Sequence, residues 1–254
     1  TIRLKCRTRA TAAASTISDP SQRSRERPNE YRAAMPLPDD ARELWITKSS
    51  RVRGARAQKH QLVEQAKKVV ERVALLDTDA VGEDTFAELI EATEELAELL
   101  DRPPSLREKG GLSAAGGDDA ILTERSGISG KSNPLAPPIH FVLDGEVTRG
   151  HAVFGAAYEG PTDCVHGGFV AAAFDDLLGC AQMASGIAGF TGTLTVKMVK
   201  PTPLYRRIDY AAGVEKVEGR KITCWGTAHD GDKLLAEATC LFIAPAEPAL
   251  RPPE

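Results

Sequence analysis

The hydrophobic positions divide the chain into a helical first half and a β-rich second half. Residues 84–100 begin with a possible N-cap, Asp84, carry apolar residues at helical spacing, and are followed by Pro103 and Pro104. In residues 60–76, apolar side chains recur at alternating intervals of three and four: Leu62, Ala66, Val69, Val73 and Leu76. Such spacing is typical of amphipathic helices. We therefore predict a helical hairpin that packs on the rest of the protein or pairs across a dimer.

Strand-like patterns begin after the two prolines at positions 137 and 138. The Ala-rich stretch 167–184 lies between an early and a late group of strand-like segments, and it indicates one long helix ending near Gly186 and Gly189. Short apolar runs bounded by Gly, Pro and Asp predict strands at 139–143, 151–158, 191–200, 205–217, 221–229 and 233–243. One helix between antiparallel strands favours an α+β fold in which the sheet wraps around the central helix.

Composition predicts five segments along the chain. Residues 1–38 are basic and poor in acidic residues, which favours a disordered leader or upstream sequence before a start at Met35; a transit peptide is the alternative. The predicted segments after it are a helical extension (39–101), a flexible Gly/Ser/Pro-rich linker (102–136), the α+β domain (137–245) and a tail (246–254). The linker contains a GKS sequence, but Arg125 stands where a P-loop needs glycine, so we predict no nucleotide site.

Charge and cysteine content narrow the functional class. A net charge of −4 gives no argument for nucleic-acid binding. No apolar run approaches the roughly 18 residues of a membrane span. The five cysteines are scattered and form no CxxC motif, which predicts reduced thiols and a cytoplasmic protein. The five histidines show no ligand spacing, so we expect no metal site.

The candidate chemistry centres on residues 166–175. Gly167 and Gly168 allow tight backbone geometry where the central helix begins, and the first N–H groups of a helix lack partners within it. A carbonyl oxygen that becomes an oxyanion would be stabilised there. Asp175 returns to the same helix face, but about 10 Å further along the axis. One carbonyl carbon cannot lie close to both groups. The carboxylate would therefore come from a second copy, in a homodimer or a dimer of dimers.

A series of short motifs follows in order along the chain: HGG at 166–168, Asp175, Thr191, the turn 200–204 and the blocks 216–221 and 237–243. Together these motifs resemble the hotdog-fold acyl-CoA thioesterases of the phenylacetyl-CoA thioesterase (PaaI) type, and most closely the branch containing the human thioesterase superfamily members. The resemblance covers roughly residues 137–245 and implies a hotdog-fold enzyme that hydrolyses an acyl-CoA to the free acid and CoA without a metal or redox cofactor.

The resemblance also implies roles for individual residues. Asp175 would act as nucleophile or general base, assisted by the hydroxyl of Thr191, and the N–H of Gly168 would hold the thioester oxygen. Gly167 would shape the turn, and His166 would orient the loop or contact substrate. Ordinary structural interpretations remain open: an exposed helix aspartate, glycines needed for close packing, and a threonine placed by β-propensity.

The substrate follows from the resemblance in the same way. Four basic residues would bind the CoA phosphates, although solvated strand ends are the alternative: Lys197, Lys200, Arg220 and Lys221. The aromatic-acyl type often carries Asn or Gln before HGG, which residues 159–165 lack, so we expect a fatty acyl-CoA. A non-catalytic hotdog module that binds acyl-CoA or a protein partner is the alternative function, as is a thioesterase for acyl-carrier-protein thioesters.

Overall fold

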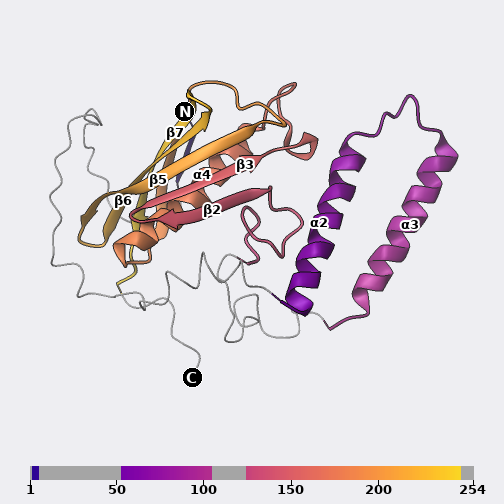
Figure 1. Cartoon of the computed structure of the whole chain (residues 1–254), viewed down its shortest axis with the longest axis horizontal. Helices are drawn as coiled ribbons and strands as arrows, with labels where there is room; N and C mark the ends of the chain where they lie inside the picture. Colours follow the sequence, from indigo (N-terminus) through magenta and orange to yellow (C-terminus); the bar gives the residue numbers. More distant parts are fainter. Residues whose placement is uncertain (1, 6–52, 105–123, 247–254) are drawn as a thin grey trace.

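A single antiparallel sheet forms the centre of the protein. The computed structural model describes residues 2–5, 53–104 and 124–246 (Figure 1). The strands are β1 (Ile2–Lys5), β2 (Ile139–Asp144), β3 (Val147–Val153), β4 (Phe190–Met198), β5 (Arg207–Glu218), β6 (Lys221–Asp230) and β7 (Lys233–Ile243). Their order in the sheet is β1-β4-β7-β6-β5-β3-β2, and every neighbouring pair is antiparallel.

Helix α4 (Gly167–Gln182) lies along one face of this sheet, and a short 3-10 helix, η7 (Met183–Ser185), extends its end (Figure 1). Phe174, Leu177 and Leu178 are fully buried in the core between helix and sheet. Gly226 of β6 permits the close approach, because a Cβ there would lie 3.2 Å from Leu178 and 3.3 Å from Phe174. The predicted α+β fold, a sheet wrapped around one central helix, is therefore confirmed.

The second strand of the domain lies earlier than its sequence suggested. We predicted a strand at 151–158, whereas β3 ends at Val153 and residues Ala156–Tyr158 form a 3-10 helix, η6. Polar residues at the start of β3 hid it from the apolar pattern. They join the sheet because β3 pairs on both sides, with β2 and with β5. A tight turn links β2 to β3, and Gly145 takes a positive φ of 62° there.

Strand β1 pairs with β4 and forms one edge of the sheet, although its residues fall in the segment expected to be a leader. The rest of that segment, including Met35, lies outside the described residues. The same holds for residues 39–52 of the predicted helical extension, for 105–123 of the predicted linker and for the tail from 247. Residues 124–136, by contrast, make specific contacts with α2 (Ala55–Ala74), with the central helix and with η6.

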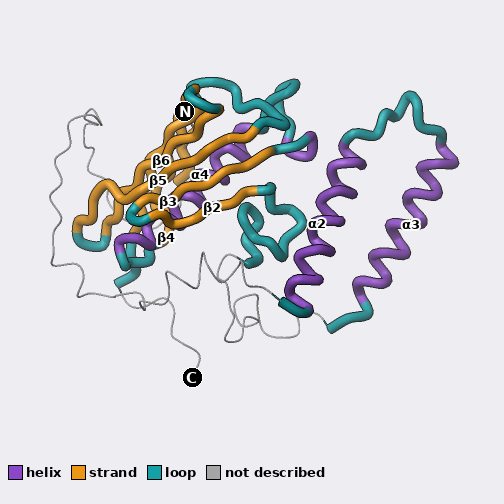
Figure 2. Tube along the Cα trace, viewed as in Figure 1, coloured by secondary structure: helices purple, strands orange, loops and turns teal. Residues whose placement is uncertain are grey.

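The predicted helical hairpin consists of α2 (Ala55–Ala74) and α3 (Glu83–Asp101). The N-cap of α3 is Gly82, and Asp84 instead lies in its first turn. Figures 1 and 2 show α2 beside the domain and α3 on its outer side. None of the helices in the described ranges is both long and apolar enough to cross a membrane.

Helix α2 is fixed to the domain through Glu71. Its carboxylate accepts the N–H groups of Ala156 and Ala157, at 2.8 and 3.0 Å, and the hydroxyl of Tyr205 at 3.0 Å. Burial acts to raise the pKa of Glu71, but these hydrogen bonds outweigh it and hold the pKa below its usual range. Tyr205 has a positive φ of 56°, a rare conformation for a bulky residue. The domain therefore binds the polar side of α2.

Candidate active site

The start of α4 is closed by its own N-cap residue. His166 is the N-cap, and its Nδ1 accepts the N–H of Gly168 at 3.0 Å. The backbone oxygen of His166 accepts the N–H of Phe169 at 2.9 Å. The N–H of Gly167 has no partner among the described residues. An incoming oxyanion would therefore meet the N–H of Gly167 first, and would reach that of Gly168 only if the His166 ring turned aside.

Close packing holds this turn in place. The N–H of His166 donates to the backbone oxygen of Tyr158 at 2.9 Å. The rings of Tyr158 and Phe169 meet edge to face, with centroids 5.0 Å apart. A Cβ at Gly160 would lie 2.7 Å from the Cα of His166, so this glycine is required by the approach of the two segments. The helix start is thus preorganised by its surroundings.

The second part of the site is a carboxylate bound to a hydroxyl. Thr191, near the start of β4, donates its Oγ1 hydrogen to Oδ1 of Asp175 at 2.9 Å. Burial raises the pKa of Asp175, and the neighbouring charge of Asp176 raises it too; the bond from Thr191 acts in the opposite direction but does not outweigh them. Asp175 is consequently a stronger base than an exposed aspartate, with one oxygen oriented by Thr191.

The two parts of the site are not brought together within one chain. Helix α4 is continuous from Gly167 to Gln182. At 1.5 Å per residue, the seven residues from Gly168 to Asp175 span about 10 Å along the axis. A single carbonyl group cannot contact both. One protomer therefore contains two candidate half-sites, one at the start of α4 and one around Asp175.

Asp176 has a function in the fold that the sequence did not reveal. Its Oδ2 accepts the hydroxyls of Ser126 at 2.8 Å and Ser129 at 2.6 Å. Helical periodicity places Asp176 about 100° around the axis of α4 from Asp175. Its partners lie 50 and 47 residues earlier, too far for any local signal. Residues 124–138 are called the 124–138 loop. Asp176 thus binds this loop to α4 beside the candidate base.

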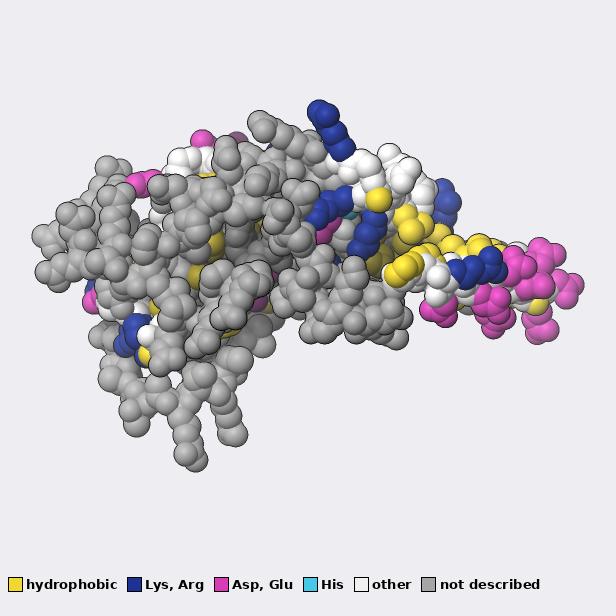
Figure 3. Space-filling model, turned by 90° about the horizontal axis from the view of Figure 1, so that it is seen from below, with side chains coloured by type: hydrophobic (Ala, Val, Ile, Leu, Met, Phe, Trp, Pro, Cys, Tyr) yellow, Lys and Arg dark blue, Asp and Glu magenta, His cyan; other side chains and the backbone are white. Residues whose placement is uncertain are grey.

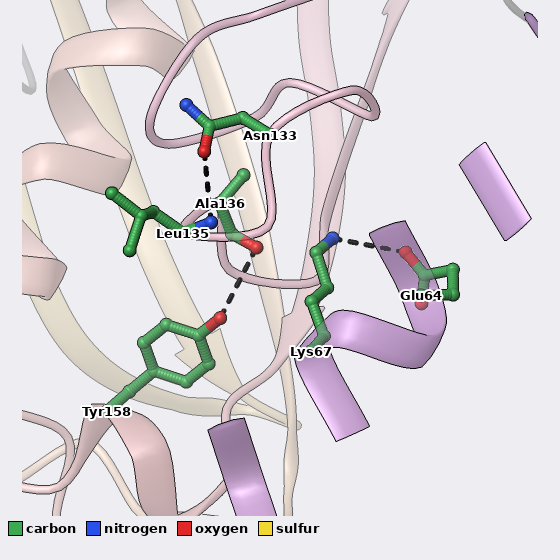
Figure 4. Close-up of polar contacts among 6 residues, drawn as sticks. All are labelled: Glu64, Lys67, Asn133, Leu135, Ala136 and Tyr158. Carbon is green, nitrogen blue, oxygen red and sulfur yellow. Dashed lines mark hydrogen bonds and ion pairs between the residues drawn. The ribbon is translucent and has the colours of Figure 1, made fainter. Parts of the chain in front are cut away.

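The 124–138 loop is also bound to α2 and to η6, and Figure 2 shows it between α2 and the sheet. Glu124 bonds to His60 of α2 and accepts the hydroxyl of Ser132. At its other end, the backbone oxygen of Ala136 accepts the hydroxyl of Tyr158 at 3.3 Å (Figure 4). This loop therefore links the helical hairpin to both half-sites.

The four candidate CoA-binding cations lie in two groups. In the sheet register Lys197 pairs with Glu237 and Lys221 pairs with Ile243. These two positions are six residues apart along β7, so roughly 20 Å separates the groups. Lys197 also forms an ion pair with Glu237 at 2.7 Å.

Each cation group lies near a different half-site. Lys200 is two residues before Thr202, whose oxygen accepts the N–H of Val165 just ahead of α4. Arg220 donates to the backbone oxygen of Ala244 at 2.7 Å, and Lys221 lies in the sheet row that contains Phe190, next to Thr191. The structure therefore places Lys197 and Lys200 toward the helix start, and Arg220 and Lys221 toward the end where β4 begins.

Metal ligation has no support in the part of the chain that the structure describes: no group of three or more His, Cys, Asp or Glu side chains could hold an ion there.

Comparison with known proteins agrees with this architecture. No protein-family model matches the chain. Over 91 residues it is 37% identical to acyl-coenzyme A thioesterase THEM4 of Xenopus laevis, a match covering 35% of this chain and 41% of that protein. For THEM4 of Mus musculus the identity is 34%, and the match covers 35% of this chain and 39% of that protein. The chain therefore matches well under two thirds of the length of these curated relatives.

A solved structure covers more of the chain. A crystal structure of a thioesterase superfamily protein superimposes with a TM-score of 0.62 at 28% sequence identity, over 73% of this chain and 94% of that one. Such a match extends beyond the sheet and α4. The architecture and these likenesses together show that residues 139–243 form a hotdog-fold domain similar to those of thioesterase-superfamily proteins.

Proposed function

We propose that this domain is an acyl-CoA thioesterase that releases a free acid and CoA. The proposal rests on the half-buried Asp175 of the central helix, whose pKa is raised and whose Oδ1 accepts the hydroxyl of Thr191 in β4. A base whose pKa is moved toward the working pH is suited to proton abstraction. The likeness to curated acyl-CoA thioesterases supports the choice of substrate.

The reaction would need one water and no cofactor. Asp175 takes a proton from water as the water oxygen attacks the thioester carbon. The carbonyl electrons move to the oxygen, which is stabilised by the N–H groups at the start of α4. The C–S bond then breaks as the carbonyl re-forms, and the CoA sulfur leaves with the proton held by Asp175. Direct attack by the carboxylate is the other route, and the raised pKa favours the water route.

We infer that two copies of the chain build each site. The helix start of one copy and Asp175 of the other would surround one thioester, because the two groups are about 10 Å apart within a chain. A two-fold axis generates two such sites per dimer. A dimer of dimers would preserve the same arrangement.

In this composite site, the two cation groups would bind the same CoA molecule. Lys200 would come from the copy that supplies the helix start, and Arg220 and Lys221 from the copy that supplies Asp175. Cations about 20 Å apart in one chain would then approach the same CoA from two sides. Lys and Arg are suited to its phosphate groups.

We propose a fatty acyl group in preference to an aromatic one. Residues 159–165 precede the helix start and contain no amide side chain that could polarise the thioester carbonyl. The side-chain hydrogen bond that the structure describes in this stretch is internal, since Glu159 accepts the N–H of Asp163 at 2.7 Å. The carbonyl would then be bound mainly by backbone N–H groups.

A reducing compartment such as the cytoplasm suits the cysteines. The four that the structure describes are free thiols, and Cys180, Cys224 and Cys240 are buried in the domain. Burial raises the pKa of the Cys180 and Cys224 thiols to about 12, so these groups remain protonated and unreactive.

The test is release of free thiol from short, long and aromatic acyl-CoAs by the full chain. We expect turnover of the panel with a preference for fatty acyl groups. Turnover of the aromatic members alone would overturn the acyl preference and leave the reaction intact. Binding of acyl-CoA without release of thiol from any member would contradict the enzyme and favour a binding module.

Replacing Thr191 by valine should slow the reaction without abolishing it, because the carboxylate of Asp175 loses the hydroxyl that orients it. A hydrogen bond to a charged group contributes about 1.5–3 kcal/mol, so we expect kcat to fall roughly 10- to 100-fold. Because the bond from Thr191 lowers the pKa of Asp175, its loss should raise that pKa further and move the acidic limb of the pH–rate profile to higher pH. Thr193→Val on the same strand is the control. An unchanged acidic limb would show that Thr191 does not act on the base.

A further inference from the structure

Helix α2 meets the domain with its polar side. His60 and Glu71 bond to the domain and its 124–138 loop, and Val63 is the buried residue between them. These three residues lie on one side of the helix at spacings of three to eight. At 100° per residue, the centre of the apolar stripe through Leu62, Val69 and Val73 lies more than a third of a turn from the centre of this side. Docking on the domain therefore turns the stripe outward.

Helix α3 carries a second apolar stripe that is also uncovered. Val73 of α2 is 62% exposed, and Leu89, Leu96 and Leu100 of α3 are 44%, 42% and 52% exposed. Within the described residues, the two helices leave both stripes exposed. Figure 3 shows apolar side chains along the projecting hairpin and acidic ones at its outer end. Contiguous apolar surface of this kind marks an interaction site.

The charges on the two helices identify the occupant. Helix α2 carries five basic residues against two acidic ones, whereas α3 carries eight acidic residues and no basic one. Lys59 and Arg72 are exposed and flank the stripe of α2, and Glu88 and Asp101 flank that of α3. Each hairpin therefore has one apolar stripe flanked by basic residues, on α2, and one flanked by acidic residues, on α3. Two identical hairpins are complementary to each other for this reason.

We propose that the hairpin is a self-association arm, in which α2 of one copy packs on α3 of a second copy and the reverse contact forms by symmetry. The result is a four-helix arrangement that buries all four apolar stripes and sets each acidic helix beside a basic one. Charges beside an apolar seam decide which helices pair. This arm is independent of the thioesterase reaction.

A charge-swap experiment tests this pairing in the full-length chain. One variant carries Lys59→Glu and Arg72→Glu, and the other carries Glu88→Lys and Asp101→Lys. Each alone places like charges along the contact, whereas a mixed pair restores opposite charges in both contacts. After the two differently tagged variants are unfolded, mixed in equal amounts and refolded, we expect the ratio of heterodimers to homodimers to exceed its random value about fivefold, measured by native mass spectrometry.

The control variants change the same total charge away from the stripes. They carry Lys68→Glu with Lys233→Glu, and Glu91→Lys with Glu98→Lys, and their mixture should assemble at the random share. Circular dichroism checks that all four variants keep their helix content. Random assembly of the stripe variants would overturn the proposal and indicate that another part of the same chain covers the stripes. An equal excess in the controls would also overturn it, because bulk charge would then explain the pairing.

Discussion

Replacing Asp175 by asparagine is expected to lower kcat/KM about 10³-fold, within the range that a general base contributes. Asparagine keeps the shape of the side chain and an oxygen that can accept the hydroxyl of Thr191, but it cannot take a proton. The measurement is thiol release from the best acyl-CoA of the panel, with CoA affinity determined separately. We expect CoA binding to be unchanged.

The neighbouring residue supplies a matched control. Asp176→Asn removes a charge one position away and keeps an oxygen for Ser126 or Ser129. Its activity should stay within about tenfold of wild type, since it takes no proton from water. Because the charge of Asp176 raises the pKa of Asp175, this variant should move the acidic limb of the rate profile to lower pH. Equal losses in both variants would contradict a specific role for Asp175.

Stability separates loss of chemistry from loss of fold. The pKa of Asp175 is higher in the folded protein than in an exposed aspartate, so ionisation of Asp175 destabilises the fold at neutral pH. Asp175→Asn should therefore have a Tm equal to or above that of wild type at pH 7. The difference should vanish at low pH, where the carboxyl is protonated in both states. A lower Tm at neutral pH would mean that the lost activity reflects damage to α4.

Two inactive variants are expected to restore activity when they assemble together. Gly168→Val would spoil the helix start, because even a Cβ there lies 3.0 Å from Nδ1 of His166. In a mixed dimer with Asp175→Asn, one composite site has both an intact helix start and an intact carboxylate, whereas the other has neither. Random assembly should thus recover about a quarter of wild-type activity, more than 100-fold above either variant alone.

The same mixture distinguishes a site that two chains build together from a site that lies within one chain. Recovery should follow the fraction of mixed dimers, measured by native mass spectrometry after the variants are refolded together. A mixture of Asp175→Asn with itself, differently tagged, controls for the effect of refolding. If mixed dimers form and remain inactive, each site lies within one chain, and the 10 Å separation must be bridged by a movement of α4 or its first turn.

Local sequence determined the elements that make this domain. The Ala-rich stretch after the two glycines forms α4 from Gly167 to Gln182, close to the predicted 167–184, because helical periodicity and terminal glycines act within a few residues. The strands 221–229 and 233–243 follow from alternation of buried and exposed residues in the same way. The HGG turn and Asp175 could be selected because both lie on one element.

Contacts between distant segments were decided only by the tertiary structure. Thr191 could be chosen over Thr193 by resemblance alone, and its bond to Asp175 exists because β4 packs beside α4. The ties from Asp176 to Ser126 and Ser129 join residues about 50 positions apart, for which no spacing rule exists. The hydrogen bond from the N–H of Gly168 to Nδ1 of His166 depends on the orientation of the imidazole ring, which the sequence does not specify. Helical periodicity located the apolar stripe of α2 in the sequence. Only the tertiary structure shows that this stripe faces outward, because the hydrogen bonds of Glu71 and His60 hold the opposite side of the helix against the domain.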